Sequence, residues 1–252
     1  MPSHQIGSFK STLKDLLNRF PVPVPKKVGR NWWLSHPLQV RWKTEAHILS
    51  WAEQVLRKGD TVIDVGAHAG WISLASSGIV GSNGHVVAIE PSPPLASLIR
   101  YHRTVNLAFS IVVEEFAATD SRGIADFFIY NRGLSSINAL SESSVAREAP
   151  STSSIERICV NTRSLDDYCK FNKLIPNLIK IDVEGAELLA IRGASTILAE
   201  HKPALILAVH PPLMPCGGET ELFGLLHHYQ YVLRDSHQLA VGSDVWGDYL
   251  LA

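Results

Sequence analysis

Cysteine is scarce in this chain of 252 residues. It has 3 cysteines, Cys159, Cys169 and Cys216, and no two of them form a CxxC pair. This odd number and spacing speak against a zinc site of the usual kind. They favour free thiols, which are typical of a reducing compartment, so we expect a cytoplasmic protein.

Net charge and long apolar runs are also lacking. The formal net charge is −1, so no overall field attracts nucleic acid, and we expect no nucleic-acid partner. No apolar run reaches the roughly 18 residues of a membrane span, and the first residues lack the layout of a signal peptide. Hydrophobic residues make up 46% and charged residues 19%, which is enough for a sizeable core.

The length fits one α/β domain, which we place at residues 44–252, preceded by an arm over residues 1–43. Apolar spacing in the arm predicts a helix over residues 8–20, and the prolines of residues 21–25 predict a stiff, extended connector. Lys26, Lys27 and Arg30 then precede Trp32 and Trp33. This cluster could hold a phosphate or a base, but a solvated face over packed aromatics is more typical. The arm is a candidate substrate cover or homodimer contact.

The stretch from Gly59 to Gly70 organises the rest of the chain. Thr61 to Val65 reads as a buried strand, the loop from Gly66 to Gly70 follows it, and a helical pattern begins at Trp71. Glycines in such a loop let backbone N–H groups approach a ligand. Asp64 lies at the carboxyl end of the strand, where open α/β sheets bind their ligands. An ordinary strand–helix turn is the alternative.

Strands and helices alternate along most of the domain, which predicts a doubly wound, mostly parallel sheet. The expected helices are residues 44–56, 93–105, 165–171, 186–198 and 219–229. The expected strands are residues 61–65, 85–89, 111–116, 125–130, 155–160, 178–183, 204–209, 231–233 and 249–251, with the last two as a hairpin-like pair. The serine-rich residues 141–154 are expected to form either a mobile lid or a disordered insertion.

The type of ligand follows from two features near the glycine loop. Glu90 ends the strand after the loop, where a carboxylate can accept hydrogen bonds from both hydroxyls of a ribose. The loop has GxxxG spacing, and His68 replaces the central glycine of the GxGxxG dinucleotide fingerprint. These features favour a nucleoside ligand without a pyrophosphate, such as S-adenosylmethionine. An NAD(P)-linked oxidoreductase is the alternative.

A second cluster lies in the block from Leu178 to Glu187. Lys180, Asp182 and Glu184 alternate along an apolar strand, which places them on one side. Charges on a buried strand are unfavourable unless they are paired or face a cleft, so Lys180 either pairs with Asp182 or another acid or belongs to a site. His210 closes another strand at the analogous end, although a hydrogen-bonded loop histidine is equally compatible. Together these side chains could form a general base or a metal site.

Five segments resemble, in order, the motifs of the FkbM-type methyltransferase family. They are residues 64–70, 117–120, 134–136, 162–168 and 180–187. The resemblance covers about residues 44–252 and is most specific at Lys180-Ile-Asp-Val-Glu-Gly. It implies a class I, Rossmann-like, doubly wound fold with a seven-stranded, mostly parallel sheet. It also implies S-adenosylmethionine as the cofactor and a hydroxyl on a sugar, lipid or other small molecule as the acceptor.

The resemblance also implies roles for individual residues. The methionine side of the cofactor is assigned to Asp64, Gly66, His68 and Gly70, the ribose to Glu90, and the adenine to Phe116 and Ala117. The same cofactor site includes Ala67, Trp71, Pro91, Ser92 and Asp182. Phe116 stands where many class I enzymes have an acid, so Asp120 or backbone would have to contact the adenine amino group.

The catalytic assignments are Asp182, Glu184, His210 and Lys180. The base is Asp182, Glu184 or His210, with histidine favoured by its usual pKa. Alternatively, Asp182 and Glu184 bind a divalent cation that acidifies the acceptor. A non-catalytic nucleoside-binding module remains a further alternative.

Overall fold

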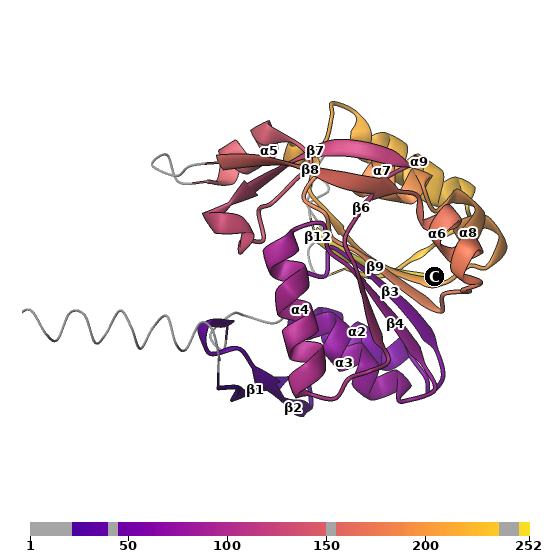
Figure 1. Ribbon diagram of the computed structural model, residues 1–252. Coiled ribbons are helices and arrows are strands. Elements are labelled where there is room, and N and C mark those ends of the chain that lie inside the picture. The colour runs from indigo at the N-terminus through magenta and orange to yellow at the C-terminus, as the bar shows by residue number, and fades with distance from the viewer. Residues whose placement is uncertain (1–21, 40–44, 150–154, 237–246) are drawn as a thin grey trace, which may run out of the picture.

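The computed structural model describes residues 22–39, 45–149, 155–236 and 247–252, and it centres on a seven-stranded sheet (Figure 1). The strand order is β11-β12-β10-β9-β3-β4-β5. The parallel strands are β3 (Thr61–Val65), β4 (His85–Ile89), β5 (Ile111–Glu114), β9 (Leu178–Ile181) and β10 (Ala204–Val209). β12 (Gly247–Leu251) runs antiparallel to both β10 and β11 (Leu233–Ser236). The predicted doubly wound, mostly parallel fold is therefore confirmed.

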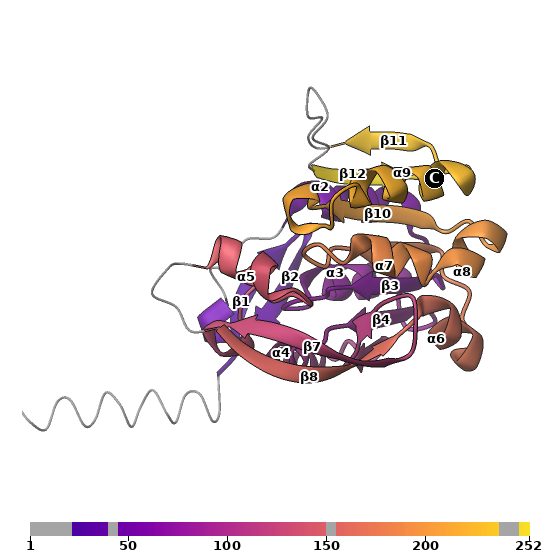
Figure 2. The same cartoon turned by 90° about the horizontal axis from the view of Figure 1, so that it is seen from above.

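Helices cover both faces of this sheet (Figures 1 and 2). One face carries α2 (Ala46–Val55), α3 (Trp71–Val80) and α4 (Pro93–Val105). The other carries α6 (Leu165–Asn172), α7 (Glu187–Arg192), α8 (Ser195–Glu200) and α9 (Gly218–His228). Alternation along β3 explains the two cores, because Val62 packs with the first set and Ile63 with the second. β3 is buried on both faces, so its one charged residue, Asp64, is buried too and needs a partner.

A smaller sheet lies beside the main one (Figure 1). It has the order β6-β8-β7, where β6 is Ala117–Ala118, β7 is Gly123–Tyr130 and β8 is Ile155–Arg163. Phe127, Ile129 and Val160 form its own small core. The sequence predicted β7 and β8 as strands, but it gave no sign that they leave the main sheet.

The described part of the N-terminal arm is a β-hairpin. β1 (Val24–Val28) pairs antiparallel with β2 (Asn31–Ser35), and the short 3₁₀ turn η1 (Pro37–Gln39) follows. Pro25 belongs to β1, so the predicted extended connector ends as a paired strand. The helix predicted over residues 8–20 lies outside the described residues. The helix expected over residues 44–56 is α2, and Glu45 occupies its N-cap.

Several predicted boundaries were wrong. Glu142–Glu148 of the expected loop form a helix, α5, which packs on β7, while residues 150–154 are not described. The helix expected over residues 186–198 is split into α7 and α8 at Gly193, where an added Cβ would lie 2.0 Å from the Thr119 carbonyl oxygen. β5 ends at Glu114 rather than Phe116.

β9 ends at Ile181, before the expected Val183, because the chain turns sharply there. Glu184 and Gly185 adopt φ of 50° and 97°. Glu184 therefore reaches the site through this turn and not by strand alternation. The remaining 3₁₀ turns are η2 (Asn131–Gly133) and η3 (Pro211–Leu213). Within the described ranges, no helix combines the length and apolar character that crossing a membrane requires.

Candidate active site

A cavity of about 730 Å³ opens at the carboxyl ends of the parallel strands, which is a usual size for a site that holds a cofactor or a small molecule. Its walls come from the main sheet, from the small sheet and from the chain that joins them. β3 and β4 contribute the glycine loop and Glu90, β9 and β10 contribute Asp182 and His210, and β6 and β7 contribute Ala117 and Phe127.

The glycine loop packs closely between the carboxyl ends of β4 and β9. The N–H groups of Gly66 and Ala67 both donate to the Ile89 carbonyl, at 3.0 and 3.1 Å. Gly66 has φ of 73°, and an added Cβ would lie 1.9 Å from the Asp182 carbonyl oxygen, so only glycine fits. His68 adopts φ of 50°, a conformation that glycine usually supplies. Burial, followed by the charge of Lys180, lowers the pKa of His68 to about 4, so its imidazole is neutral at physiological pH.

Glu90 is fixed by the loop that precedes it. Its Oε2 accepts the His68 N–H at 2.8 Å, and its Oε1 accepts the Ser92 N–H at 3.0 Å. Each oxygen keeps a lone pair for a ligand in the cavity that Glu90 lines. Burial raises the pKa of Glu90 to about 7, although both N–H groups act to lower it.

Part of the cavity wall beside the small sheet is apolar. It is formed by Phe116, Ala117, Phe127, Leu134 and Leu140, while Ser135, Ser136 and Asn138 of the segment after β7 also line the cavity. Apolar side chains suit the face of an aromatic base, whereas the carboxylate of Glu90 suits ribose hydroxyls. The residues present therefore fit an adenosine group.

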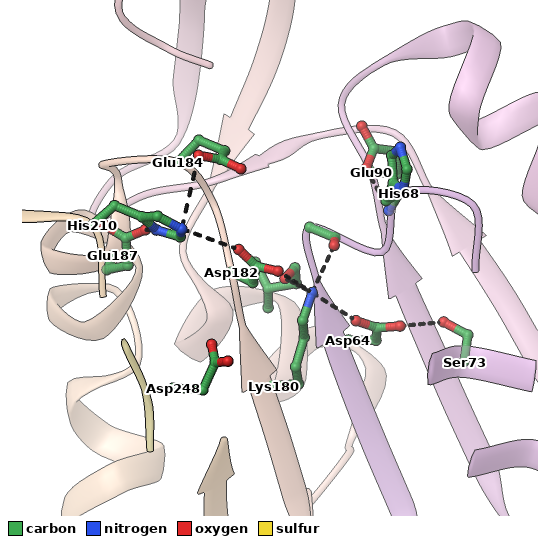
Figure 3. Close-up of polar contacts among 12 residues, drawn as sticks. Asp64, His68, Ser73, Glu90, Lys180, Asp182, Glu184, Glu187, His210 and Asp248 are labelled. Atoms are coloured by element: carbon green, nitrogen blue, oxygen red, sulfur yellow. Dashed lines mark hydrogen bonds and ion pairs between the residues drawn. The ribbon is translucent and has the colours of Figure 1, made fainter. Parts of the chain in front are cut away.

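A buried ammonium ties the two halves of the site together (Figure 3). The Lys180 Nζ donates to the Gly66 carbonyl at 2.8 Å and lies 3.5 Å from Asp64 Oδ1 and 3.4 Å from Asp182 Oδ2. Burial alone would lower the pKa of Lys180, but the two carboxylates outweigh it and hold that pKa above its usual value. The pairing of Asp64 with Lys180 follows from the register, because these residues face each other across β3 and β9.

His210 is held from behind by a carboxylate that is fully buried. Its Nδ1 lies 2.8 Å from Glu187 Oε1, which also accepts the Gly185 N–H at 3.1 Å. Burial would lower the pKa of His210, but the hydrogen bond to Glu187 and the charges of Glu187, Glu184 and Asp182 raise it to about 9. Since a carboxylate can only accept, Nδ1 carries the proton, and Nε2 is the nitrogen that can exchange one.

Two further carboxylates face this nitrogen. Nε2 lies 3.9 Å from Asp182 Oδ1 and 3.8 Å from Glu184 Oε2. One ligand atom from each of Asp182, Glu184 and His210 lies within 4.8 Å of the others, so the trio could also hold a cation. Lys180, then His210, lower the pKa of Asp182 against the effect of burial, whereas burial raises that of Glu184 to about 8.

Comparison with known proteins identifies the fold family of this site. The profile described as "Methyltransferase FkbM domain" matches residues 64–233, which is more than half of the chain. The chain belongs to the FkbM methyltransferase family. The predicted family is thereby confirmed.

Solved structures with this general fold are only distantly similar. A methyltransferase FkbM from Methylobacillus flagellatus KT shares 19% identity at a TM-score of 0.48, covering 82% of this chain and 50% of that chain. This chain thus spans about half the length of that relative. The TYW2 of P. horikoshii, in complex with MeSAdo, shares 14% identity at a TM-score of 0.49, covering 91% and 70%. A precorrin-6y C5,15-methyltransferase from Geobacter metallireducens GS-15 shares 13% at 0.46, covering 87% and 93%. No curated protein sequence matches.

Most residues predicted for the FkbM-family site line the cavity. They are Gly66, Ala67, His68, Trp71, Glu90, Pro91, Phe116, Ala117, Lys180, Asp182, Glu184 and His210. Three predicted residues act from behind the wall. Asp64 is fully buried and pairs with Ser73 and Lys180, Gly70 caps α3, and the Ser92 hydroxyl donates to the Gly133 carbonyl. Asp120, the suggested adenine contact, is exposed and does not line the cavity.

Glu187, Glu45 and Asp248 of the candidate site were not predicted as site residues. Glu187 ends the motif at residues 180–187, but only the structure shows that it lies behind His210. Glu45 and Asp248 line the cavity from distant segments and carried no signal. Asp248 reaches the cavity because β12 is antiparallel, so its start lies beside the ends of the parallel strands. Its Oδ2 lies 2.7 Å from His47 Nε2.

Proposed function

We propose that this protein is an S-adenosylmethionine-dependent O-methyltransferase that acts on a hydroxyl group of a small molecule, sugar or lipid-linked metabolite. The observation that supports the proposal is that one cavity holds two chemically different sets of residues. Glu90 and the apolar wall suit adenosine, and the trio Asp182, Glu184 and His210 suits a hydroxyl that must lose a proton. In Figure 3 Glu90 and the pair Glu184 and His210 lie on opposite sides of Lys180.

The roles of the chain's own residues follow from their contacts. Glu90 would accept hydrogen bonds from the ribose hydroxyls, and Phe116 and Ala117 would pack on the adenine. S-adenosylmethionine supplies a methyl group that is already activated as a sulfonium, so the protein mainly aligns the reacting atoms. Asp182 and Glu184 would orient the acceptor hydroxyl, and His210 Nε2 would take its proton while the oxygen gains the methyl group.

His210 is favoured as the base because Glu187 fixes its tautomer. The buried carboxylate behind Nδ1 leaves Nε2 facing the cavity, and it stabilises the imidazolium that forms when the proton arrives. Asp182 is a weaker base, because Lys180 lowers its pKa.

A divalent cation at the trio is the second candidate mechanism. The close approach of the three ligand atoms favours it. Against it, Asp182 already lies 3.4 Å from the Lys180 ammonium, whose charge would repel a metal ion. Turnover that persists in excess chelator supports the histidine base. Loss of turnover that added Mg²⁺ or Mn²⁺ restores would assign the trio to a cation.

The decisive experiment measures donor and product together. Thermal unfolding with S-adenosylmethionine and separately with NAD tests the donor, because a ligand that binds only the folded state raises the unfolding temperature. Incubation with a panel of hydroxylated acceptors, followed by mass spectrometry, should show a product heavier by one CH2 unit. Stabilisation by NAD alone would point to an oxidoreductase. Binding of the donor with no product from any acceptor would point to a non-catalytic module.

A further inference from the structure

The hairpin β1–β2 lies outside the residues that match the family profile, yet it packs against the helices α2, α3 and α4 on one face of the main sheet (Figures 1 and 2). The Asn106 side chain at the end of α4 bonds both backbone groups of Leu34, at 2.7 and 2.8 Å. The Trp33 ring lies against Gly78 of α3, where an added Cβ would come within 3.1 Å of it. Arg30 pairs with Glu53 of α2 at 2.9 Å. The hairpin is therefore anchored on this face of the domain.

His102 connects the hairpin to the glycine loop. It is fully buried on α4, and its Nε2 accepts the N–H of His36, the residue directly after β2, at 3.1 Å. On its other side, Nδ1 lies 2.8 Å from the Ala69 carbonyl oxygen. An N–H can only donate and a carbonyl can only accept, so these two partners fix the neutral tautomer with the proton on Nδ1. Burial lowers the pKa of His102 to about 4, which keeps the ring neutral.

The hairpin reaches the cofactor loop at a second place. The Lys26 ammonium lies 5.0 Å from the centre of the Trp71 ring, which lines the cavity. The centres of the Trp71 and His102 rings are 4.5 Å apart, and the two ring planes are tilted by 33°. Ala69 and Trp71 flank Gly70, and the His68 N–H just before them holds Glu90. Fixing Ala69 and Trp71 therefore also fixes the segment that positions the carboxylate proposed to bind ribose.

We propose that His102 is a positioning residue for the cofactor and that the hairpin Val24–Ser35 is a structural part of the cofactor site. This inference rests on the proposed function, since it assigns the hairpin to the S-adenosylmethionine side of the reaction. It gives the arm a role different from that of an acceptor cover or a dimer contact.

The test compares three substitutions of His102 in the full chain by calorimetric titration with S-adenosylmethionine. His102→Phe keeps an aromatic ring beside Trp71 but removes both hydrogen bonds, and it should raise the Kd by about tenfold or more. His102→Asn places an amide N–H near the position of Nδ1 and should restore the Kd to within about threefold of the wild type. His102→Gln places its amide near Nε2, reaches His36 rather than Ala69, and should not restore it.

Arg100→Ala is the matched control, because it cuts an exposed ion pair on the same helix as His102, between Arg100 and Glu115 at 2.6 Å, and both residues lie outside the hairpin and the glycine loop. Its Kd should equal that of the wild type. Wild-type affinity in His102→Phe, or equal affinities in His102→Asn and His102→Gln, would overturn the inference. A change confined to the acceptor KM would also overturn it and would make the hairpin an acceptor cover. Failure of the wild type itself to bind S-adenosylmethionine would instead refute the proposed function.

Discussion

Asp182 faces both halves of the cavity, because one of its oxygens lies near the Lys180 ammonium and the other near His210 Nε2. Substitution by Asn preserves its shape but removes the charge that orients the acceptor and the imidazole. We expect Asp182→Asn to lower kcat by at least about 100-fold, the usual range for losing a group of this kind. The affinity for S-adenosylmethionine should change little, and calorimetry checks it. Unchanged turnover would remove Asp182 from the mechanism.

The protonation of His210 should set the pH dependence of the rate. Its pKa is raised to about 9, so the imidazole is a cation at neutral pH and becomes a competent base only as the pH rises through that value. We therefore expect kcat/KM to increase with pH and to level off above about 9.

Glu187→Gln provides the control for this profile. The substitution removes the hydrogen-bonded carboxylate, which is the strongest influence that raises the pKa of His210. The rise of kcat/KM should therefore occur at lower pH, and its plateau value should fall. A rise at the same pH in both proteins would show that another group titrates.

Glu90 should make cofactor affinity depend on pH in the neutral range. Burial raises its pKa to about 7, so the carboxylate is charged above this value and protonated below it. Because the charged form is the better acceptor for ribose hydroxyls, the Kd for S-adenosylmethionine should rise as the pH falls below about 7. Glu90→Gln should weaken binding about tenfold at alkaline pH and remove the pH dependence. Calorimetric titrations at two pH values measure this, and an equal change of Kd with pH in the wild type and in Glu90→Gln would contradict this role.

At the scale of elements, the turn from β3 into α3 depends on the close approach of Gly66 to the Asp182 carbonyl. Gly81, at the end of α3, has the same φ of 73° but nothing within 4 Å of an added Cβ. Gly81→Ala therefore reports backbone strain alone, about 1–3 kcal/mol of unfolding free energy, since its ψ of −167° places it in a region that only glycine usually adopts. Gly66→Ala adds a steric clash, and we expect a loss of at least about 3 kcal/mol together with loss of cofactor binding. Urea unfolding measures both, and equal losses would show that the loop can shift.

The elements of the main sheet were largely predictable because each carries a local pattern. β3, β4 and β10 begin and end where the sequence placed them, since they are short apolar runs bounded by turn residues. The errors arose where distant contacts decide. α5 forms in a polar segment because it can pack on β7, and the split at Gly193 depends on the Thr119 carbonyl, which no local pattern reveals.

The site was also predictable where its residues stand at strand ends. Glu90, Asp182 and His210 stand at strand ends, and the rule that ligands bind there brings them together. Asp64 also stands at a strand end, but register places it opposite Lys180 and under the cavity wall. Its contribution is to hold the ammonium, which the sequence alone could not distinguish from contact with a ligand.

At the scale of the whole molecule, two separate sheets contribute residues to the cavity wall. The main sheet supplies Glu90 and Asp182, whereas the small sheet supplies Ala117 and Phe127. A cofactor that contacts both would couple them, so its binding should slow local opening on each side. This coupling is a property of neither sheet alone.

Hydrogen exchange measures such coupling directly. On addition of S-adenosylmethionine, we expect slower exchange both at the glycine loop and in β6 and β7. Amides of α9 provide the internal control. This helix packs through Leu222 and Leu226 on the face of the main sheet that α6 to α9 cover, and none of its residues lines the cavity. Protection confined to the glycine loop would mean that the small sheet does not contact the adenine. Equal protection everywhere, α9 included, would reflect only the higher global stability of the liganded protein.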